Sequence, residues 1–362
     1  MKIEKVRVDH TSWGEDVHVL VVLDADNGLA GVGEAANVTS SQILRAAAEE
    51  VVPELLGRDP FESNRLLDDL AELKDSELLP AVRNGIETAC VDLVGKQLGV
   101  SACQLFGGAV RNQIRVCATD WRNGSASLDD WAKSAAHVAR AGFTALALDP
   151  FLRDRAYNRW PESKQAVDVV RRVRETVGGD VDLVVDARNR FTASEAIAIA
   201  EELSPLSIFY LQDPVPCGDL DALEQLRRAV PIPIAVGRCG ANGTGLRQII
   251  ERQLADFIHL DSASLGGISR ARAFGLLAES WFMSVTLCHA GGLPAMATNM
   301  QMATAIPNCQ MMDLPFSVID SWQEVFGTPF KLEDGCIKLP AGTGLALDCE
   351  VLMRVSAASG TA

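Results

Sequence analysis

Between Val181 and Gly240 the chain has three short apolar runs separated by helical segments: VDLVVDARNRF (181–191), IFYLQDPVP (208–216) and PIPIAVGRCG (231–240). The polar residues Asp186, Gln212 and Arg238 end these runs at equal spacing, since 212 − 186 = 26 and 238 − 212 = 26. Strand-then-helix units of constant length, each with a polar residue at the strand end, are typical of a (β/α) barrel. Because such barrels carry their active sites at the carboxyl ends of the strands, we expect the functional site here.

Five further apolar runs continue the pattern, so that the chain offers eight candidate barrel strands: RVCATD, TALALDP, LVVDA, FYLQDP, PIAVG, FIHLD, SVTLCH and CQMMDLP. From the third run onward the starts recur every 24 to 27 residues, and amphipathic segments such as SLDDWAKSAAHVARAG lie between the runs. Eight such units that close on themselves form a parallel barrel. An open doubly wound sheet is the less favoured alternative, because no GxGxxG motif follows the first strand.

The first 113 residues have a different pattern. VRVDHTS, VHVLVVLDADNG and AGVGEA alternate with the strand period and predict a small antiparallel sheet, and helical segments follow, with Ser40 as an N-cap and Gly99 as a C-cap. The tail FKLEDGCIKLPAGTGLALD returns to alternation. We expect an α+β capping domain over 1–113, a modified TIM barrel of the (β/α)7β type over 114–325, and a C-terminal segment, 326–362, that packs back on the capping domain.

Composition limits the classes of function. Hydrophobic residues make up 48% of the 362 residues, charged residues 22%, and the net charge is −15 (33 − 48), which argues against non-specific nucleic-acid binding. The first ten residues, MKIEKVRVDH, contain no apolar core of a signal peptide, and no run approaches the ~20 apolar residues of a membrane span. Nine cysteines without a CxxC pair indicate reduced thiols. We expect an acidic cytoplasmic protein that binds neither nucleic acid nor membranes.

Motifs along almost the whole chain resemble the enolase superfamily: GLAGVGEA, LLGRDP, ETACVDLVGKQLGVSACQLFGG, GFTALALDPF, VVDARNRFTASEA, FYLQDPVP, IPIAVGR, HLDSASLGGISRA, CHAGG and EDGCIKLPAGTGLALD. The chain resembles the mandelate racemase and muconate lactonizing group, and is most similar to sugar-acid dehydratases of the galactonate dehydratase type. The resemblance implies a capping domain over a modified TIM barrel, in agreement with the pattern above. It also implies abstraction of a proton alpha to a carboxylate, with Mg²⁺ stabilising the enediolate.

The resemblance implies that three carboxylates hold this Mg²⁺, at the positions of Asp186, Gln212 and Arg238 in this chain. Gln212 still offers an amide oxygen, but the guanidinium of Arg238 repels a cation. At 4 Å two unit charges interact by about 4 kcal/mol at an effective dielectric of ~20, and a divalent ion doubles this. We therefore expect no cofactor, and no Mg²⁺ at these positions. Ala147 stands where the family has a lysine, and Arg188 stands where the dehydratases carry an acid/base histidine.

Other features of the resemblance are retained. His289 ends the seventh strand and Asp261 the sixth, which matches a dyad in which the aspartate orients the imidazole for acid/base work. Asp313 stands at the position of a family carboxylate on the eighth strand, and Asp149 is a further carboxylate near a strand end. We interpret His289 as catalytic, and expect His259 to face a helix.

Three hypotheses account for Arg238 and Arg188. In the first, a guanidinium paired with Asp186 supplies the positive charge of the lost metal and binds a substrate carboxylate or phosphate. In the second, the arginines only neutralise a leftover buried aspartate. In the third, a relocated metal is bound by Asp186, Asp213 and Asp149, although Asp213 follows the inward-facing Gln212 and so points outward.

Two tryptophans are candidate pocket residues. Trp13, in HTSWGED, belongs either to a specificity loop that closes over the barrel mouth or to a plain surface hairpin, and Trp121 follows the first barrel strand. Cys239 follows Arg238 at a strand end, so a reactive thiol is a minor alternative there.

The resulting hypothesis is a lyase or isomerase that moves a proton on a small anionic, carboxylate-type substrate without the family Mg²⁺. Arg238 would supply positive charge, with Asp186 beside it, and the His289–Asp261 dyad would be the acid/base. Arg188, Gln212, Asp313, Asp149 and the tryptophans would bind the substrate. The alternatives are a non-catalytic relative that binds a ligand or partner, and a Mg²⁺-dependent sugar-acid dehydratase with a relocated metal. We also expect a homo-oligomer.

Overall fold

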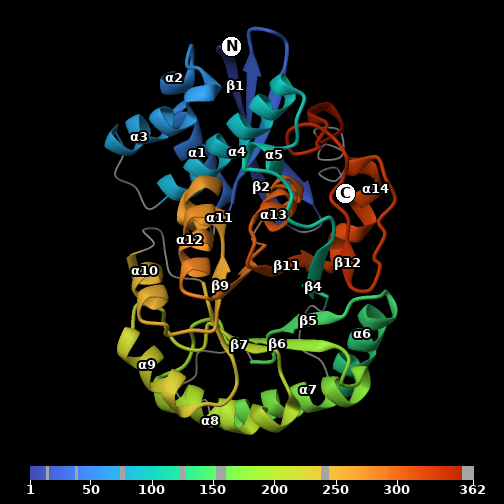
Figure 1. Ribbon diagram of the computed structural model, residues 1–362. Helices are drawn as coiled ribbons and strands as arrows, with labels where there is room; N and C mark the ends of the chain where they lie inside the picture. Colours follow the sequence, from blue (N-terminus) through green and yellow to red (C-terminus); the bar gives the residue numbers. More distant parts are fainter. Residues whose placement is uncertain are drawn as a thin grey trace.

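The computed structural model consists of a capping unit and a closed barrel that lies beneath it (Figure 1). The residues that the structure describes are 1–13, 16–36, 40–73, 78–121, 127–151, 160–237, 244–289 and 291–352. This architecture confirms the predicted modified TIM barrel with an N-terminal α+β cap.

The capping unit contains a three-stranded antiparallel sheet, in the order β1 (Ile3–Trp13), β2 (Asp16–Ala25) and β3 (Ala30–Ala35). Its helices are α1 (Ser41–Glu50), α2 (Val52–Leu55), the 3₁₀ turn η1 (Pro60–Glu62), α3 (Ser63–Leu73), α4 (Leu79–Leu98) and α5 (Ala102–Leu105). The hydroxyl of Ser40 caps α1 and Gly99 ends α4 with a φ of 69°, as predicted.

Eight parallel strands form the barrel in chain order, and the last strand pairs with the first. They are β4 (Ile114–Thr119), β5 (Ala145–Leu148), β6 (Asp182–Asp186), β7 (Tyr210–Gln212), β8 (Ile234–Val236), β9 (Phe257–Leu260), β10 (Ser284–Leu287) and β11 (Cys309–Pro315). All eight predicted strands are therefore confirmed. Alternate side chains fill the interior of the barrel, among them Cys117, Ala145, Val184, Tyr210, Ala235 and Met311.

Helices cover the outside of the barrel, because each connection between parallel strands must cross back along it. They are α6 (Leu128–Arg140), α7 (Trp160–Val177), α8 (Ala193–Leu203) with the turn η2 (Ser204–Leu206), α9 (Leu220–Ala229), α10 (Thr244–Glu251), α11 (Ser262–Leu265), α12 (Ile268–Ser280) and α13 (Leu293–Ala305). The start of α8 shows the local logic: Thr192 and Glu195 form a capping box, in which each side chain accepts from the backbone N–H of the other residue.

After the barrel, the turn η3 (Phe316–Val318) and α14 (Ile319–Phe326) lead to the short strand β12 (Cys336–Ile337), which pairs antiparallel with β4. The chain then contacts the capping unit. Gly344 forms a bridge with Ser101, and the N–H of Leu345 donates to the buried carboxylate of Asp92 at 2.8 Å. The C-terminal segment thus touches both barrel and cap.

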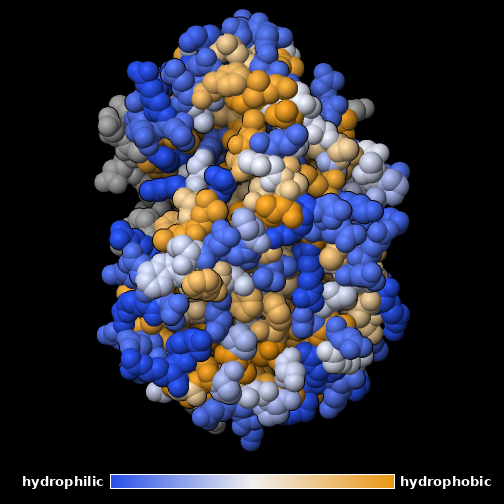
Figure 2. Space-filling model, in the orientation of Figure 1, coloured by the Kyte–Doolittle hydropathy of each residue, from blue (hydrophilic) through white to orange (hydrophobic). Residues whose placement is uncertain are grey.

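The surface is mixed in character. Figure 2 shows hydrophilic residues over most of one face, with hydrophobic residues gathered near the cap and in the middle of that face. Phe282, between α12 and β10, is the most exposed large apolar residue described, at 99% of its surface. Among the described residues no helix combines the length and apolar character needed to cross a membrane.

Candidate active site

Polar side chains collect at the carboxyl ends of the barrel strands, as the spacing predicts. Asp186 and Gln212 are paired in register on β6 and β7, and both are buried. Further polar residues at this rim come from four other strands: Asp149 follows β5, Asp261 follows β9, His289 follows β10, and Asp313 lies near the end of β11. Residues far apart in the sequence therefore meet at one rim of the barrel.

Arg188 lies between two carboxylates of this rim. Its Nε is 3.0 Å from Oδ2 of Asp149 and 3.5 Å from Oδ2 of Asp186, while its backbone N–H donates to Oδ1 of Asp186 at 3.0 Å. Arg190 binds Asp149 from the other side with two bonds, of 2.6 and 2.7 Å. Two aspartates and two arginines thus form one network at the ends of β5 and β6, and Asp149 is part of it rather than a free substrate ligand.

The backbone after β6 is shaped to present this network. Arg188 and Asn189 have φ values of 51° and 57°, in the left-handed region that few non-glycine residues adopt. The loop is held there by β7, because the N–H of Ala187 donates to Gln212 O at 2.8 Å and the N–H of Asn189 donates to Asp213 O at 2.6 Å. Such strain, maintained by neighbouring structure, is frequent at functional sites.

The described residues do not fit a Mg²⁺ ion at the family position. Asp186 is the one carboxylate among the three positions, and a guanidinium already lies against it. Gln212 contributes an amide at most. Strand β8 ends at Val236, and Arg238 lies outside the described residues, so the role we predict for it remains a prediction, as does that of Cys239.

A metal relocated onto Asp186, Asp213 and Asp149 also finds little support. Asp213 directs its Oδ1 to the backbone N–H of Gly237, at 2.9 Å, between β7 and β8. This contact agrees with the prediction that Asp213 points away from the barrel interior. The only group of three or more His, Cys or carboxylate side chains with clustered ligand atoms that the described ranges contain lies elsewhere, on β9 to β11.

His289 is a partly buried residue whose ring nitrogens are both enclosed. Neither nitrogen makes a hydrogen bond of good geometry to a described residue. Burial lowers the pKa of the imidazole, and the nearby carboxylates of Glu34 and Asp313 only partly oppose this. The ring is therefore neutral near pH 7, which is the state that a general base requires.

The structure shows no hydrogen bond between Asp261 and the ring nitrogens of His289, so the predicted dyad stays a prediction. Asp261 is instead the N-cap of α11: its Oδ1 accepts from the N–H of Ala263 at 3.0 Å, and its Oδ2 accepts from the hydroxyl of Ser264. An aspartate before a helix has backbone donors within its own turn, and these compete with a partner on another strand. Whether Asp261 takes part in catalysis stays a prediction.

We expected His259 to face a helix, but it lies inside the barrel and is fully buried. Its Nδ1 is 2.7 Å from the hydroxyl of Thr286 on the neighbouring strand, and its Nε2 is 3.2 Å from Oδ2 of Asp313. The residue alternates with Phe257 and Asp261 along β9, so all three share the inner face. Its polarity is met by β10 and β11, which the sequence of β9 alone does not reveal.

The two tryptophans differ in how well they are placed. Trp121 is buried, donates from its indole N–H to Ala147 O at 2.7 Å and packs edge-on against Trp131 of α6 at 5.5 Å between ring centroids. These contacts are those of a packing residue. Trp13 ends β1, pairs with Asp16, and its side chain lies outside what the structure describes.

Sequence reasoning missed Glu34, a buried residue of the cap that reaches the barrel. Its carboxylate accepts from the backbone N–H groups of Gly292 at 2.7 Å and Ala295 at 3.2 Å, and its Oε1 lies 2.9 Å from Nδ1 of His18. It thereby caps the first turn of α13, directly after the loop that carries His289. The signal available in the sequence was its place in the strand AGVGEA, two residues after Val32 and facing the barrel side.

Replacing Glu34 with alanine is expected to lower the free energy of unfolding by about 2–3 kcal/mol, because the buried N–H of Gly292 and the partly buried N–H of Ala295 lose their acceptor. The measurement is the midpoint of urea-induced unfolding followed by circular dichroism. Glu34→Gln should lose less, since its amide oxygen still accepts from Gly292. An alanine variant that unfolds at the wild-type midpoint contradicts a capping role.

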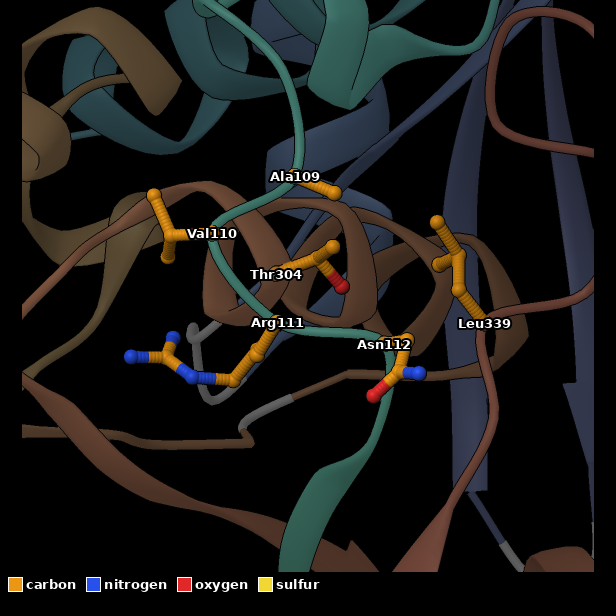
Figure 3. A pocket seen from close by; sticks show the side chains of 6 residues that line it. All are labelled: Ala109, Val110, Arg111, Asn112, Thr304 and Leu339. Atoms are coloured by element: carbon orange, nitrogen blue, oxygen red, sulfur yellow. The ribbon is translucent and has the colours of Figure 1, made fainter.

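A depression of about 480 Å³ lies away from this rim (Figure 3). Arg111 is its charged residue, but the guanidinium is already used by the carbonyl oxygens of Ala303, Ile306 and Pro307 at the end of α13. That end of α13 precedes β11 and so lies at the opposite rim of the barrel from His289. With its cation occupied, this depression is not a candidate anion site. The residues around it are Ala109, Val110, Arg111, Asn112, Thr304 and Leu339.

Comparison with known families agrees with this architecture. Residues 2–107 match the N-terminal domain of mandelate racemase / muconate lactonizing enzymes, and residues 130–350 match the enolase C-terminal domain-like family. The chain therefore belongs to the enolase superfamily, in the mandelate racemase and muconate lactonizing group.

Individual relatives are dehydratases. The chain is 29% identical over 350 residues to the D-xylonate dehydratase of Haloferax volcanii, covering 92% of this chain and 84% of the relative. It is 26% identical over 335 residues to the D-gluconate dehydratase of Thermoproteus tenax, covering 91% and 67%. The solved structure of a mandelate racemase/muconate lactonizing enzyme from Sulfitobacter sp has a TM-score of 0.86 at 26% identity, covering 98% and 95%. The protein is an enzyme of lyase or isomerase type.

Proposed function

We propose that the protein removes water from a small polyhydroxy acid, with a guanidinium at the position of the family metal. The observation that carries the proposal is the contact of Arg188 with Asp186, the one retained family ligand, at 3.5 Å. The names of the relatives, which act on gluconate and xylonate, support a sugar acid as the substrate class.

The arrangement of the barrel supports separate roles for Arg188, which would bind the substrate carboxylate, and His289, which would take the proton. In a closed barrel of eight strands, β6 and β10 are four strands apart and lie across the mouth from one another. Arg188 therefore stands on one side of the mouth and His289 on the other. A substrate whose carboxylate binds Arg188 would present its alpha carbon toward the imidazole.

In the proposed reaction, neutral His289 takes the proton from the carbon alpha to the carboxylate. The electrons of that C–H bond form a C=C bond as the hydroxyl on the next carbon leaves, and the imidazolium returns the proton so that water departs. The enol that results tautomerises to a 2-oxo acid. Arg188 stabilises the negative charge that develops on the carboxylate during proton abstraction. If Arg238 supplies positive charge as the sequence predicts, it would stabilise the same negative charge.

The second candidate is a Mg²⁺-dependent sugar-acid dehydratase, which the dehydratase relatives favour. One contact supports it: Asp149 and Asp186 approach the same nitrogen of Arg188, at 3.0 and 3.5 Å, so the two carboxylates are close together. A cation in place of the guanidinium would meet both. The third candidate, a barrel that binds a small anion without turnover, shares the same binding residues.

Metal dependence and Arg188→Gln separate these candidates. With a panel of sugar acids and detection of the 2-oxo acid, we expect full activity after dialysis against EDTA and a loss of about 10²–10³ in kcat/KM for Arg188→Gln. Arg172→Gln is the matched control and should leave activity unchanged, because the ion pairs described for Arg172 of α7, with Asp129 of α6 and Glu175 of α7, are exposed.

The opposite pattern supports the second candidate. If EDTA abolishes activity, Mg²⁺ restores it and the purified protein holds stoichiometric Mg²⁺, the guanidinium does not replace the metal. If no sugar acid is converted but one binds with an affinity that depends on Arg188, the third candidate is favoured.

A further inference from the structure

Three neighbouring strands place a polar cluster inside the barrel that the proposed reaction does not use as a unit. His259 lies on β9, Thr286 on β10, Cys288 directly after β10, and Asp313 on β11. All four are buried. Inward positions of such barrels are normally filled by apolar side chains, so this cluster requires an explanation.

The histidine of this cluster is oriented like a metal ligand. Its Nδ1 contacts the hydroxyl of Thr286 at 2.7 Å, which fixes the ring and leaves Nε2 directed at Asp313 and Cys288. Nε2 has no hydrogen-bond partner of good geometry among the described residues, although Oδ2 of Asp313 is 3.2 Å away. A ring held through one nitrogen, with the other directed at an anionic group, is the usual arrangement of a ligating histidine.

The separations agree with a small coordination sphere. The imidazole nitrogen, the Cys288 sulfur and a carboxylate oxygen of Asp313 all lie within 4.8 Å of one another. For metal–ligand bonds of 2.0–2.1 Å in tetrahedral geometry, neighbouring nitrogen and oxygen ligands are about 3.3 Å apart, close to the 3.2 Å observed. The Cys288 sulfur lies within 4.8 Å of both and would move toward them when a metal binds. The hydroxyl of Tyr210 on β7 is also buried and lacks a hydrogen-bond partner of good geometry in the described chain.

We propose that His259, Cys288 and Asp313 bind a divalent transition metal, with Zn²⁺ as the favoured ion. A thiolate, an imidazole and one carboxylate suit zinc or iron and disfavour Mg²⁺, which prefers oxygen ligands throughout. The site lies on β9, β10 and β11, whereas the family position lies on β6, β7 and β8. The inference therefore goes beyond the proposed function and does not depend on it.

The test is Co²⁺ titration of the full-length protein, freed of metal under reducing conditions, together with the zinc content of protein purified without chelators. A sulfur-to-cobalt charge-transfer band requires a thiolate ligand and therefore reports coordination by cysteine. We expect one equivalent of Co²⁺, a sulfur-to-cobalt charge-transfer band and visible bands of tetrahedral cobalt. Cys288→Ser should lose the charge-transfer band, and Thr286→Val should weaken binding about 10–100-fold.

Cys309→Ser is the matched control, because Cys309 is a buried free thiol on β11 whose Sγ lies 3.6 Å from the carbonyl of Met311, outside the cluster. It should bind Co²⁺ as the wild type does. Absence of a charge-transfer band in the wild-type protein overturns the proposal without any variant, and shows that His259 and Asp313 form an ion pair only. A band that survives Cys288→Ser, or is lost in Cys309→Ser, assigns the metal to another thiol and also overturns it.

Discussion

Replacing His289 with asparagine is expected to lower kcat/KM for the sugar-acid substrate by about 10²–10⁴, the usual contribution of a general base. Asparagine keeps a similar size and polarity but has no basic nitrogen. The imidazole is enclosed, makes no hydrogen bond of good geometry to a described residue, and stands across the barrel mouth from Arg188. His10→Asn is the matched control, because His10 is exposed on β1 and contacts only the backbone of Ser41. Formation of the 2-oxo acid is the measurement.

The pH profile gives an independent readout of the same residue. A base must be neutral to take a proton, so activity falls at pH values below its pKa. Because burial lowers the pKa of His289, the acid limb of kcat/KM should lie below the ~6.5 of an ordinary histidine. If the midpoint of the acid limb lies above the ordinary histidine pKa, another group is the base. The same holds if the acid limb persists unchanged in the asparagine variant.

The position of the site followed from the sequence because barrels obey a simple rule. Equal spacing of Asp186 and Gln212 placed both at the ends of neighbouring parallel strands, and the structure pairs them in register. Period-two alternation then determines which side chains face inward, and it placed Gln212 inside and Asp213 outside. Information of this kind is local, so a single chain is enough to read it.

Contacts between distant segments were not readable in this way. Asp261 satisfies the backbone of its own turn instead of His289, and His259 finds Thr286 and Asp313 across two strands. Glu34 acts on α13, which begins 259 residues later at Leu293 (293 − 34 = 259). Each case depends on which of several competing partners wins after packing, and that competition is decided in three dimensions.

The strand that carries Glu34 also shows a packing constraint that its sequence hides. In AGVGEA, Gly31 and Gly33 alternate along β3 and face α4. A Cβ at Gly33 would lie 1.9 Å from the carbonyl oxygen of Gly85 and 2.7 Å from the backbone nitrogen of Ala89. The sheet and the helix therefore meet backbone to backbone, and neither side has a flexible side chain that can move away.

Replacing Gly33 with alanine is accordingly expected to lower the free energy of unfolding by about 3 kcal/mol, at the upper end of the range for overpacked cores. The helix must withdraw from the sheet, and Glu34 would move with β3, so its bonds to the start of α13 should weaken and kcat/KM should fall as well. Urea-induced unfolding followed by circular dichroism gives the stability change. Gly179→Ala is the matched control, because a Cβ there meets no atom within 4 Å and should change stability little. A Gly33→Ala protein with the wild-type urea midpoint would show that α4 can move away from β3 without loss of stability. The bonds of Glu34 would then not depend on the close approach of β3 to α4.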